Sequence, residues 1–365
     1  MRIVELIPSL AVGGAERVAA LLASELSALG HEVDVVSLFD PVGSWVEDDL
    51  RRAGVPMHFL GKRPGFDARM VPRLARFLAA RRPDVLHTHL HTLKYALPAR
   101  VAWRGRMVHT VHNLAEHEVE AESRLVHRIA FRTGVAPVAI GAAVTTSLRR
   151  EYGIRPRSVI PNGIPLASCR TPEGTREAAR AELGIPDDAP VFVTVGRLDA
   201  QKDHAGLLAA FATSRVATRG GRLLIAGDGG LRPVLQERAL AHGVADKVMF
   251  LGVRRDVPRL LAAADAFVLA SRWEGNPLVI LEAMAAGLPV VATAVGCVPE
   301  LVSERTGWLV PAGDVTAMAH ALAQVARGLP DARARGRAGA EVAAARFDST
   351  VMARAYATLF AEVAC

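Results

Sequence analysis

The chain has 365 residues, which is enough for about two domains with cores of their own. Its hydrophobic content is 51%, but no stretch approaches the roughly 18 unbroken apolar residues of a membrane-spanning helix, and no signal region precedes the first apolar segment. Three scattered cysteines, Cys169, Cys297 and Cys365, exclude a disulfide framework and a cysteine metal site, so a cytoplasmic protein is expected.

The net charge of +7 is concentrated in the first part of the chain. Residues 1–165 carry 22 Lys and Arg against 16 Asp and Glu. A basic half predicts an anionic partner, such as nucleic acid, anionic lipid or a phosphorylated substrate. The alternative is an arginine-rich composition without function, because 40 of the 44 cationic residues are arginine.

Short apolar runs alternate with amphipathic helical stretches through the first half. The run at residues 2–7 is followed by a turn at Gly13 and Gly14 and by a helical pattern over residues 15–29. Further strands are predicted at 32–38, 84–90, 106–113, 138–147 and 158–163. Strands rich in Val and Ile and separated by helices predict a parallel sheet covered on both faces.

One of these strands carries a row of histidines, His87, His89 and His91, in the stretch DVLHTHLHT. Residues two apart on a strand point to the same face, so the three imidazoles are expected to line up. Such a row could bind a metal, because imidazole is a common zinc ligand. It could also line a cleft, or be a strand end that is merely rich in histidine.

A Pro- and Gly-containing linker, IPNGIPLASCRTPEGT, separates this half from a second series of apolar runs. These runs lie at 191–198, 222–229, 247–253, 266–271, 289–296 and 307–313. The sequence therefore predicts two doubly wound α/β domains, residues 1–165 and 166–345, facing each other across a cleft. Residues 346–365 are expected to form a helix that crosses back to the first domain. Ligands of such sheets bind beyond the carboxyl ends of the strands.

Two cations follow the first strand of the second domain. Arg197 stands at the strand end, and Lys202, one of only four lysines, comes just before a helix. Fixed positive charge beside the free N–H groups of a helix start suits a diphosphate. A solvated turn is the alternative interpretation.

Two glutamates flank the predicted start of a later helix, in SRWEGNPLVILEAMAAGLPVVAT. Pro277 fits the first helical turn, which places Glu274 in the loop and Glu282 inside the helix. The N–H groups of residues 278–280 would then be donors without helical partners, suited to phosphate. Carboxylates can accept hydrogen bonds from sugar and ribose hydroxyls, although a loop glutamate and an exposed helix glutamate would look the same.

Several segments together carry a resemblance to a known family. They are GGAERVAALLASELSALGHEV near the start, IPNGI at the junction, VGRLDAQKD, AGDG, the Glu274–Glu282 segment and VGCVPELV. In this order they resemble a glycosyltransferase of family 4 with the GT-B fold, the retaining group that uses nucleotide sugars. The resemblance covers nearly the whole chain. Cys297 departs from it in a motif peripheral to the donor, and Pro165 weakens only the match at the junction.

The resemblance implies a role for each matched residue. Arg197 and Lys202 would bind the donor diphosphate and stabilise the leaving group, Glu274 would hold sugar hydroxyls, and Glu282 the ribose. His112 matches a histidine close to the reactive carbon, so the catalytic set is His112, Glu274, Arg197 and Lys202. Further donor contacts are expected at Gly13, Gly14, Val253, Arg254, Asn276, Leu278 and Val279, and a pocket for the acceptor at His87, His89 and His91.

The resemblance also implies that no metal or other cofactor is needed, because protein cations replace a metal at the diphosphate. No two of the 17 aspartates are two residues apart, so the Asp-x-Asp motif of a metal-using transferase is absent. The expected partners are a UDP-, GDP- or dTDP-sugar and an unidentified acceptor (glycolipid, polysaccharide or small natural product), and no nucleic acid. The alternatives are a nucleotide-sugar epimerase on the same scaffold, a histidine-cluster metal hydrolase and a non-catalytic sugar-nucleotide binding protein. A dinucleotide oxidoreductase is disfavoured because the chain lacks G-x-G-x-x-G.

Two basic amphipathic stretches suggest contact with an anionic membrane. Residues 67–84 place Arg69, Arg73, Arg76 and Arg81 beside Met70, Leu74, Phe77 and Leu78, and residues 123–134 align Arg124, Arg128 and Arg132 at four-residue spacing. Helices of this kind can lie on an anionic bilayer. The solvated face of an enzyme without membrane contact has the same pattern.

Overall fold

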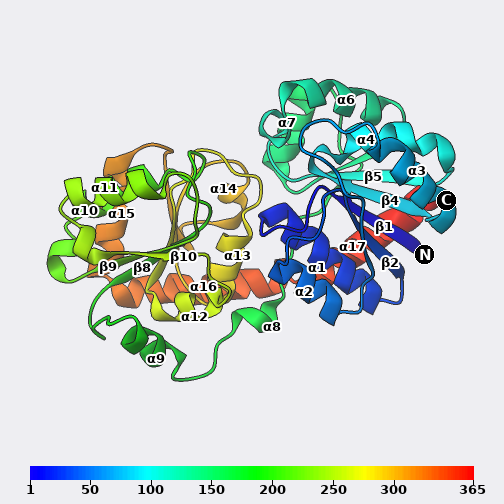
Figure 1. Ribbon diagram of the computed structural model, residues 1–365. Helices are drawn as coiled ribbons and strands as arrows, with labels where there is room; N and C mark the ends of the chain where they lie inside the picture. The colour runs from blue at the N-terminus through cyan, green and yellow to red at the C-terminus, as the bar shows by residue number, and fades with distance from the viewer. The chain divides into compact units, whose positions relative to one another are not determined.

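The computed structural model describes residues 1–365, which form two compact units (Figure 1). The first unit contains Met1–Gly163 together with Ser349–Cys365, and the second contains Ile164–Asp348. The division at Gly163 and Ile164 lies within the predicted linker. Both units are α/β, with a parallel sheet between layers of helices.

The first unit is built on a seven-stranded sheet of order β3-β2-β1-β4-β5-β6-β7. All its neighbouring strands pair in parallel, and the strands near its centre are buried along almost their whole length, as their Val- and Ile-rich sequences require. The strands are β1 (Arg2–Ile7), β2 (Glu32–Ser37), β3 (Met57–Phe59), β4 (Val85–His89), β5 (Arg106–Val111), β6 (Ala136–Ala139) and β7 (Ser158–Val159).

Helices cover this sheet, and one of them replaces part of a predicted strand. The strand expected over residues 138–147 ends at Ala139, and α7 begins at Ala142. The β-branched residues of that segment favoured a strand, but Val144 and Leu148 are buried on one face of a helix instead. The helices are α1 (Gly14–Ala28), α2 (Trp45–Arg52), α3 (Met70–Arg81), α4 (Leu93–Ala99), α5 (Ala115–Glu118), α6 (Ala121–Arg132) and α7 (Ala142–Tyr152), with 3₁₀ turns at Leu90–Thr92 and Arg100–Ala102.

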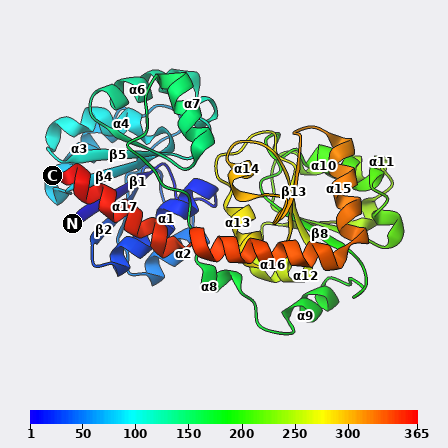
Figure 2. The same ribbon diagram turned by 180° about the vertical axis from the view of Figure 1, so that it is seen from behind.

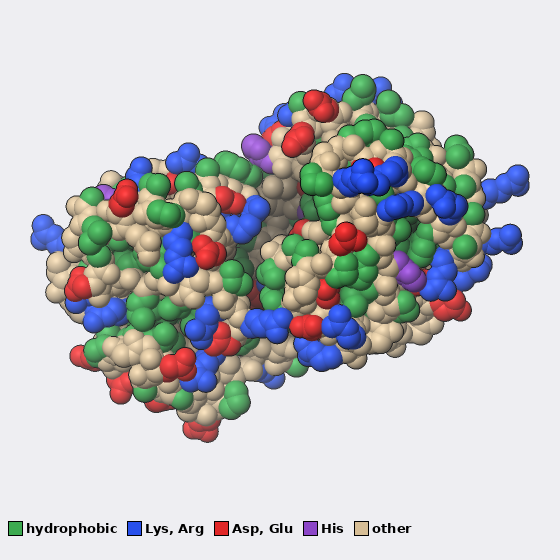
Figure 3. Space-filling view, in the orientation of Figure 1, with side chains coloured by type: hydrophobic (Ala, Val, Ile, Leu, Met, Phe, Trp, Pro, Cys, Tyr) green, Lys and Arg blue, Asp and Glu red, His purple; other side chains and the backbone are tan.

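The apolar face of α3 belongs to the protein core. Met70, Leu74 and Leu78 are fully buried and pack with residues of β1, β2 and β4, so they cannot contact a bilayer. Lys and Arg side chains gather on the surface where α3 and α4 lie (Figure 3). No helix of the chain combines the length and the apolar character that crossing a bilayer requires.

The last helix, α17 (Ser349–Ala364), completes the first unit. It packs along α1 and reaches β4 and β5 (Figure 2). Its inward residues Met352, Tyr356, Leu359 and Phe360 are buried, and Ser349 Oγ donates to Glu25 of α1 at 2.5 Å. This helix follows the whole second unit in sequence.

The second unit has a six-stranded parallel sheet of order β10-β9-β8-β11-β12-β13. Its strands are β8 (Val191–Val195), β9 (Arg222–Ala226), β10 (Val248–Gly252), β11 (Ala266–Leu269), β12 (Val290–Thr293) and β13 (Gly307–Val310). Its helices are α8 (Leu166–Cys169), α9 (Thr175–Glu182), α10 (His204–Thr213), α11 (Arg232–Ala241), α12 (Val257–Ala263), α13 (Leu278–Ala285), α14 (Val298–Leu301), α15 (Val315–Arg327) and α16 (Leu329–Arg346), with 3₁₀ turns at Ala217–Arg219 and Ala245–Lys247.

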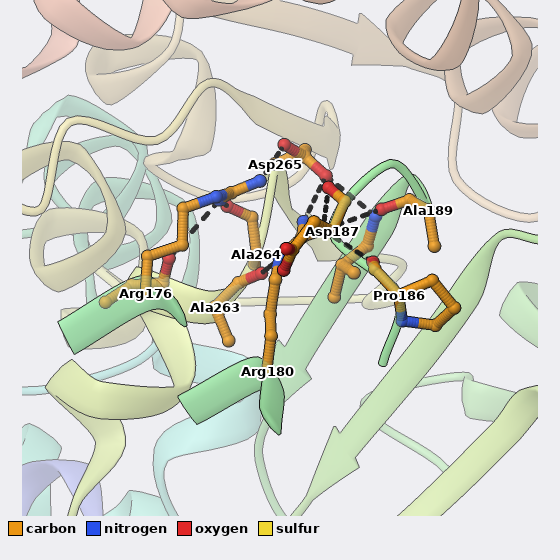
Figure 4. Close-up of polar contacts among 10 residues, drawn as sticks. Arg176, Arg180, Pro186, Asp187, Ala189, Ala263, Ala264 and Asp265 are labelled. Atoms are coloured by element: carbon orange, nitrogen blue, oxygen red, sulfur yellow. Dashed lines mark hydrogen bonds and ion pairs between the residues drawn. The ribbon is translucent and has the colours of Figure 1, made fainter. Parts of the chain in front are cut away.

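A buried charge cluster fastens α9, the first longer helix after the linker, to this sheet. Arg176 and Arg180 of α9 both point to Asp265, which lies just before β11 (Figure 4). Arg180, only 1% exposed, also donates to the carbonyl oxygens of Pro186, Asp187, Ala189 and Ala263. Asp265 Oδ2 also accepts from the N–H of Val191 at 2.9 Å, which links the cluster to β8. Each nitrogen of the buried Arg180 guanidinium therefore has a hydrogen-bond partner, the condition under which burial of charge is tolerated.

Candidate functional site

The predicted donor-binding residues of the second unit follow the carboxyl ends of neighbouring strands. Arg197 and Lys202 lie in the segment after β8, Val253 and Arg254 come after β10, and Glu274 lies in the loop after β11. The order β10-β9-β8-β11 brings these loops to one edge of the sheet. This edge is the usual binding position in a doubly wound fold.

Lys202 and Glu274 form a largely buried ion pair at this edge. Lys202 Nζ lies 2.6 Å from Glu274 Oε1, and the two side chains are 14% and 6% exposed. Ser271 Oγ donates to the same oxygen at 2.6 Å. The sequence predicted both charged residues as separate ligand contacts but did not predict that they pair, and it missed Ser271. The position of Ser271, three residues before Glu274 at a strand end, was the available signal.

Further hydrogen bonds join the segment after β8 to the loop after β11. Gln201 Nε2 donates to the carbonyl of Trp273 at 3.0 Å, and the N–H of Arg272 donates to the carbonyl of Gln201 at 2.8 Å. Asp203, the N-cap of α10, pairs with Arg272 at 3.3 Å. The cationic and acidic residues of the site are therefore carried by one cross-linked pair of loops.

The VGCVPE segment contacts the backbone of Glu274 and of the next residue. Gly296 has a φ of +52°, and a Cβ atom built there would lie 1.8 Å from the carbonyl oxygen of Glu274, so glycine is required. The next residue, Cys297, donates its N–H to the carbonyl of Gly275 at 3.0 Å. This motif, interpreted from sequence as peripheral, fixes the backbone that carries the glutamate.

Arg197 is held less tightly than Lys202. Its side chain is 70% exposed and lies 3.2 Å from Asp199. Asp199 also accepts from the N–H groups of Gln201 and Lys202, which fixes the turn between the two cations. Arg197 is therefore an exposed cation, whereas Lys202 is largely buried.

Helix α13 begins one residue later than predicted. Pro277 is extended, with ψ of 115°, and serves as the N-cap, so Leu278 and Val279 are the first helical residues. The N–H of Ile280, predicted to be a free donor, bonds to the carbonyl of Pro277 at 3.1 Å. The N–H groups of Leu278 and Val279 have no partner within the helix and remain the candidate phosphate donors.

Glu282 and Asn276 are both buried, at 7% exposure each. The alternative interpretation of Glu282 as an exposed helix glutamate is therefore wrong. Glu282 is in the second turn of α13, and Asn276 precedes the helix, so both lie close in sequence to the candidate phosphate donors.

Val253 and Arg254 differ in their surroundings. Val253 is 63% exposed, which leaves it available to an aromatic base. Arg254 forms a two-bond pair with Asp256, at 2.7 and 2.6 Å, and this pairing raises the pKa of the guanidinium.

In the first unit, the half-buried His112 follows the carboxyl end of β5. Its Nε2 lies 2.8 Å from Nδ1 of His89, and Nε2 of His89 lies 2.7 Å from Oε2 of Glu5. Burial lowers the pKa of His112 well below its usual value, and His89 and His87 lower it further. Sequence reasoning missed Glu5, although an acidic residue within the otherwise apolar β1 signals a buried partner.

The histidine row differs from its prediction. His87 and His89 lie on β4 and have no exposed surface, so they cannot line an acceptor pocket. The strand ends at His89, and Leu90, with φ of +53°, turns the chain into a 3₁₀ turn that carries His91 away from the row. Only His91 is partly exposed, and burial together with Lys94 and Lys62 lowers its pKa to about 4.

Gly13 and Gly14 join the segment after β1 to α1. Gly13 is the N-cap in an extended conformation, and a Cβ at Gly14 would meet no atom within 4 Å. Neither backbone conformation nor packing around Gly14 requires a glycine. Open space at a helix N-terminus is compatible with close approach of a ligand.

Comparison with known proteins identifies two family models along the chain. The model described as glycosyltransferase family 4 matches residues 12–168, and the model described as glycosyl transferases group 1 matches residues 175–342. The first lies mostly in the first unit and the second lies in the second unit.

Individual relatives and solved structures agree with these models. A D-inositol 3-phosphate glycosyltransferase of Streptomyces scabiei is 32% identical over 309 residues, covering 76% of this chain and 67% of that protein. An Escherichia coli UDP-Gal:alpha-D-GlcNAc-diphosphoundecaprenol alpha-1,3-galactosyltransferase is 28% identical over 298 residues, covering 78% and 77%. The crystal structure of Anabaena HepE in complex with UDP and glucose has a TM-score of 0.89 and 23% identity, covering 99% of this chain and 100% of that one.

Proposed function

Since the chain belongs to glycosyltransferase family 4 and has the GT-B fold, we propose that it transfers a sugar from a nucleoside diphosphate sugar to an acceptor hydroxyl with retention of configuration. The observation that carries the proposal is the Lys202–Glu274 pair, buried at the carboxyl edge of the second sheet beside the start of α13. This pair supports the proposal because a fixed cation could bind a diphosphate and an adjacent carboxylate could bind sugar hydroxyls.

In the proposed reaction, the bond between the anomeric carbon and the diphosphate oxygen breaks, and the acceptor oxygen bonds to the same face of that carbon. The nucleoside diphosphate departs with the bonding electrons, and the proton released by the acceptor hydroxyl ends on this leaving group. Lys202 and Arg197 would stabilise the negative charge that develops on the diphosphate, with the first-turn N–H groups of α13. Glu274 would orient the sugar, Glu282 the ribose, and His112 would contact the sugar near the reacting carbon.

We propose that the reaction needs no metal, because two protein cations and a helix N-terminus already supply positive charge for the leaving group. The donor most worth testing first is a UDP-sugar, since HepE is solved with UDP and glucose and the E. coli relative is described as using UDP-Gal. GDP- and dTDP-sugars complete the screen. The acceptor is a hydroxyl compound of a lipid-linked, polysaccharide or small-molecule class.

A nucleotide-sugar epimerase is not favoured. The family models and the relatives described above are transferases. An epimerase would also need acid and base groups at the sugar, whereas Glu274 is already paired with Lys202 and Ser271.

The experiment combines a donor screen with analysis of the product. Thermal shift with UDP-, GDP- and dTDP-sugars should identify the donor, because a ligand at 100 Kd stabilises the folded state by about 2.7 kcal/mol. Transfer should survive EDTA, and NMR of the product should show the donor's anomeric configuration. Inversion would refute the retaining assignment, and activity lost with EDTA and restored by zinc or manganese would refute metal independence.

We also propose peripheral contact with an anionic membrane through α6 rather than α3. On α6, Leu125 and Ile129 are 61% and 46% exposed, and Arg128 and Arg132 are exposed beside them. Each surface cation gains about 1 kcal/mol at an anionic bilayer. The protein should sediment with anionic but not neutral vesicles at low salt. Arg128→Glu with Arg132→Glu should abolish this, whereas Arg219→Glu on the second unit should not. Failure to sediment with anionic vesicles would refute the proposed membrane contact.

A further inference from the structure

A continuous line of polar side chains connects the interior of the first unit with His112. Glu5, at the middle of β1, is fully buried and sits opposite His87 in the register of β1 and β4. Its Oε2 contacts Nε2 of His89 at 2.7 Å, and Nδ1 of His89 contacts Nε2 of His112 at 2.8 Å. His112 Nδ1 has no hydrogen-bond partner in the protein.

The protonation state of these groups fixes the direction of each hydrogen bond. Burial would raise the pKa of Glu5, but His87 and His89 outweigh it and lower the pKa to about 2. Burial and His87 lower the pKa of His89 to about 4, although Glu5 opposes the shift. Near neutral pH, Glu5 is therefore a carboxylate, and His89 and His112 are neutral imidazoles with one N–H each.

Only one arrangement of protons satisfies both contacts. The carboxylate can only accept, so His89 carries its proton on Nε2 and presents the lone pair of Nδ1 to His112. His112 must then donate from Nε2, which leaves Nδ1 as an acceptor. We propose that Glu5 is a positioning residue for His112, which it holds, through His89, as the Nε2–H tautomer with Nδ1 free to accept a hydrogen bond from a substrate hydroxyl.

A second series of contacts runs from Glu5 through His87 to Thr110 and Tyr356. His87 Nδ1 lies 2.8 Å from the same carboxylate oxygen, at an angle outside hydrogen-bond geometry, and its Nε2 contacts Thr110 Oγ1 at 2.7 Å. Thr110 Oγ1 in turn lies 2.8 Å from the hydroxyl of Tyr356, on α17. His87 also packs on Tyr356 and Phe360.

The tautomer of His112 does not depend on the proposed function. Only the identity of the hydroxyl that hydrogen-bonds to His112 rests on it. An acceptor Nδ1 can receive the O–H of a donor sugar or of the acceptor compound. The opposite tautomer would present an N–H, which can bind an oxygen but cannot take a proton from it. Glu5 forms no bond to substrate and acts only by selecting the tautomer.

The direct test is the tautomer itself, read from long-range ¹H–¹⁵N spectra of protein labelled with ¹⁵N-histidine. The His112 signals are assigned from their absence in His112→Gln. His112 should be the Nε2–H form at neutral pH. A Nδ1–H form or an imidazolium in the wild-type protein would overturn the proposal. This measurement needs no donor or acceptor, so it decides the proposal even if no nucleotide sugar is turned over and the proposed function fails.

Variants supply the second readout. Glu5→Gln offers one acceptor oxygen and an N–H₂ group in place of two acceptors, and Glu5→Leu removes the acceptor entirely. Glu5→Leu should populate the Nδ1–H form of His112 and lower turnover of the nucleotide sugar that passes the donor screen about 10- to 100-fold, by analogy with loss of the outer-shell partner of a metal-ligating histidine, with donor Kd unchanged. Glu5→Gln, which keeps an acceptor oxygen for His89, should have a smaller effect on both.

The matched control is Thr88→Val. Thr88 lies on β4 between His87 and His89, is equally buried, and bonds to His109 rather than to this line. It should leave both the tautomer and turnover unchanged. A folded Glu5→Leu protein with wild-type tautomer and turnover would overturn the proposal. So would a stoichiometric metal lost in Glu5→Gln, because ligand atoms of Glu5, His87 and His89 within 4.8 Å of one another would then bind a metal instead.

Discussion

At the scale of single residues, the charges of Lys202 and Glu274 compensate each other. Both side chains are largely buried, and neither charge would be compensated if its partner were removed. Their pairing keeps an ammonium and a carboxylate at fixed positions on the sheet edge. Arg197, exposed and paired only with Asp199, lacks this constraint.

Lys202→Ala should lower turnover by about 10²–10³, the effect of removing one donor to a developing negative charge. The variant should also be less stable, because Glu274 is left buried without its cation. Steady-state rates and thermal unfolding measure the two effects. Lys247→Ala is the control, since Lys247 also pairs with a carboxylate, that of Asp246, but at the surface. A folded Lys202→Ala protein with wild-type turnover would contradict the assignment.

The two glutamates should differ in which kinetic parameter they affect. Glu282→Ala should chiefly weaken donor binding, because the ribose is remote from the reacting carbon. Glu274→Ala should reduce turnover more, because it would orient the sugar itself. Donor Kd and kcat, measured on both variants, separate the roles, and the opposite pattern would exchange the two assignments.

At the scale of elements, the sequence predicted what local patterns determine. Val- and Ile-rich runs such as residues 191–195 became strands, and the linker between the two sheets was recognisable from its composition. Contacts between distant segments were not predictable. No local pattern reveals that Lys202 pairs with Glu274, that Glu5 meets His89, or that Leu90 turns the chain out of β4.

The attachment of α9 is another contact of this kind, and it gives a prediction for stability. Asp265→Ala would leave Arg180 buried without its carboxylate, and breaking a buried pair costs about 3–5 kcal/mol. The carbonyl oxygens around Arg180 favour the lower end of that range. Equilibrium urea unfolding with hydrogen exchange of α9 peptides measures the loss. Asp246→Ala, at an exposed pair, is the control, and equal stability of the two variants would contradict the structural role of the cluster.

For the whole molecule, the histidines predict that the two units differ in acid sensitivity. In the first unit the pKa values of His89, His91 and His127 are lowered to about 4, mainly by burial, and those of His109 and His112 lie well below normal. In the second unit only His204 is lowered in this way, to about 4. Between roughly pH 6.5 and 4 the unfolded chain binds more protons than the folded one, so stability falls as pH falls.

The first unit should therefore lose hydrogen-exchange protection before the second when pH falls from neutral to about 5. Glu118 acts in the opposite sense. Burial raises its pKa to about 8, so its contribution to the stability of the first unit increases as pH falls from 8 to 4.5. One such carboxyl is outnumbered by five histidines. The second unit in the same sample is the internal control. Earlier loss of protection in the second unit would show that these histidines do not govern acid unfolding.

The position of α17 in the chain has a consequence for synthesis on the ribosome. The second unit, Ile164–Asp348, is contiguous in sequence and has all its elements once Asp348 has left the exit tunnel. The first unit emerges earlier but lacks the helix that covers β4 and β5 and supplies Tyr356 and Phe360. It stays incomplete, with that surface uncovered, until α17 has also left the exit tunnel. The unit that emerges first is therefore the last to be completed, and emergence of α17, rather than of residue 163, marks the end of its folding.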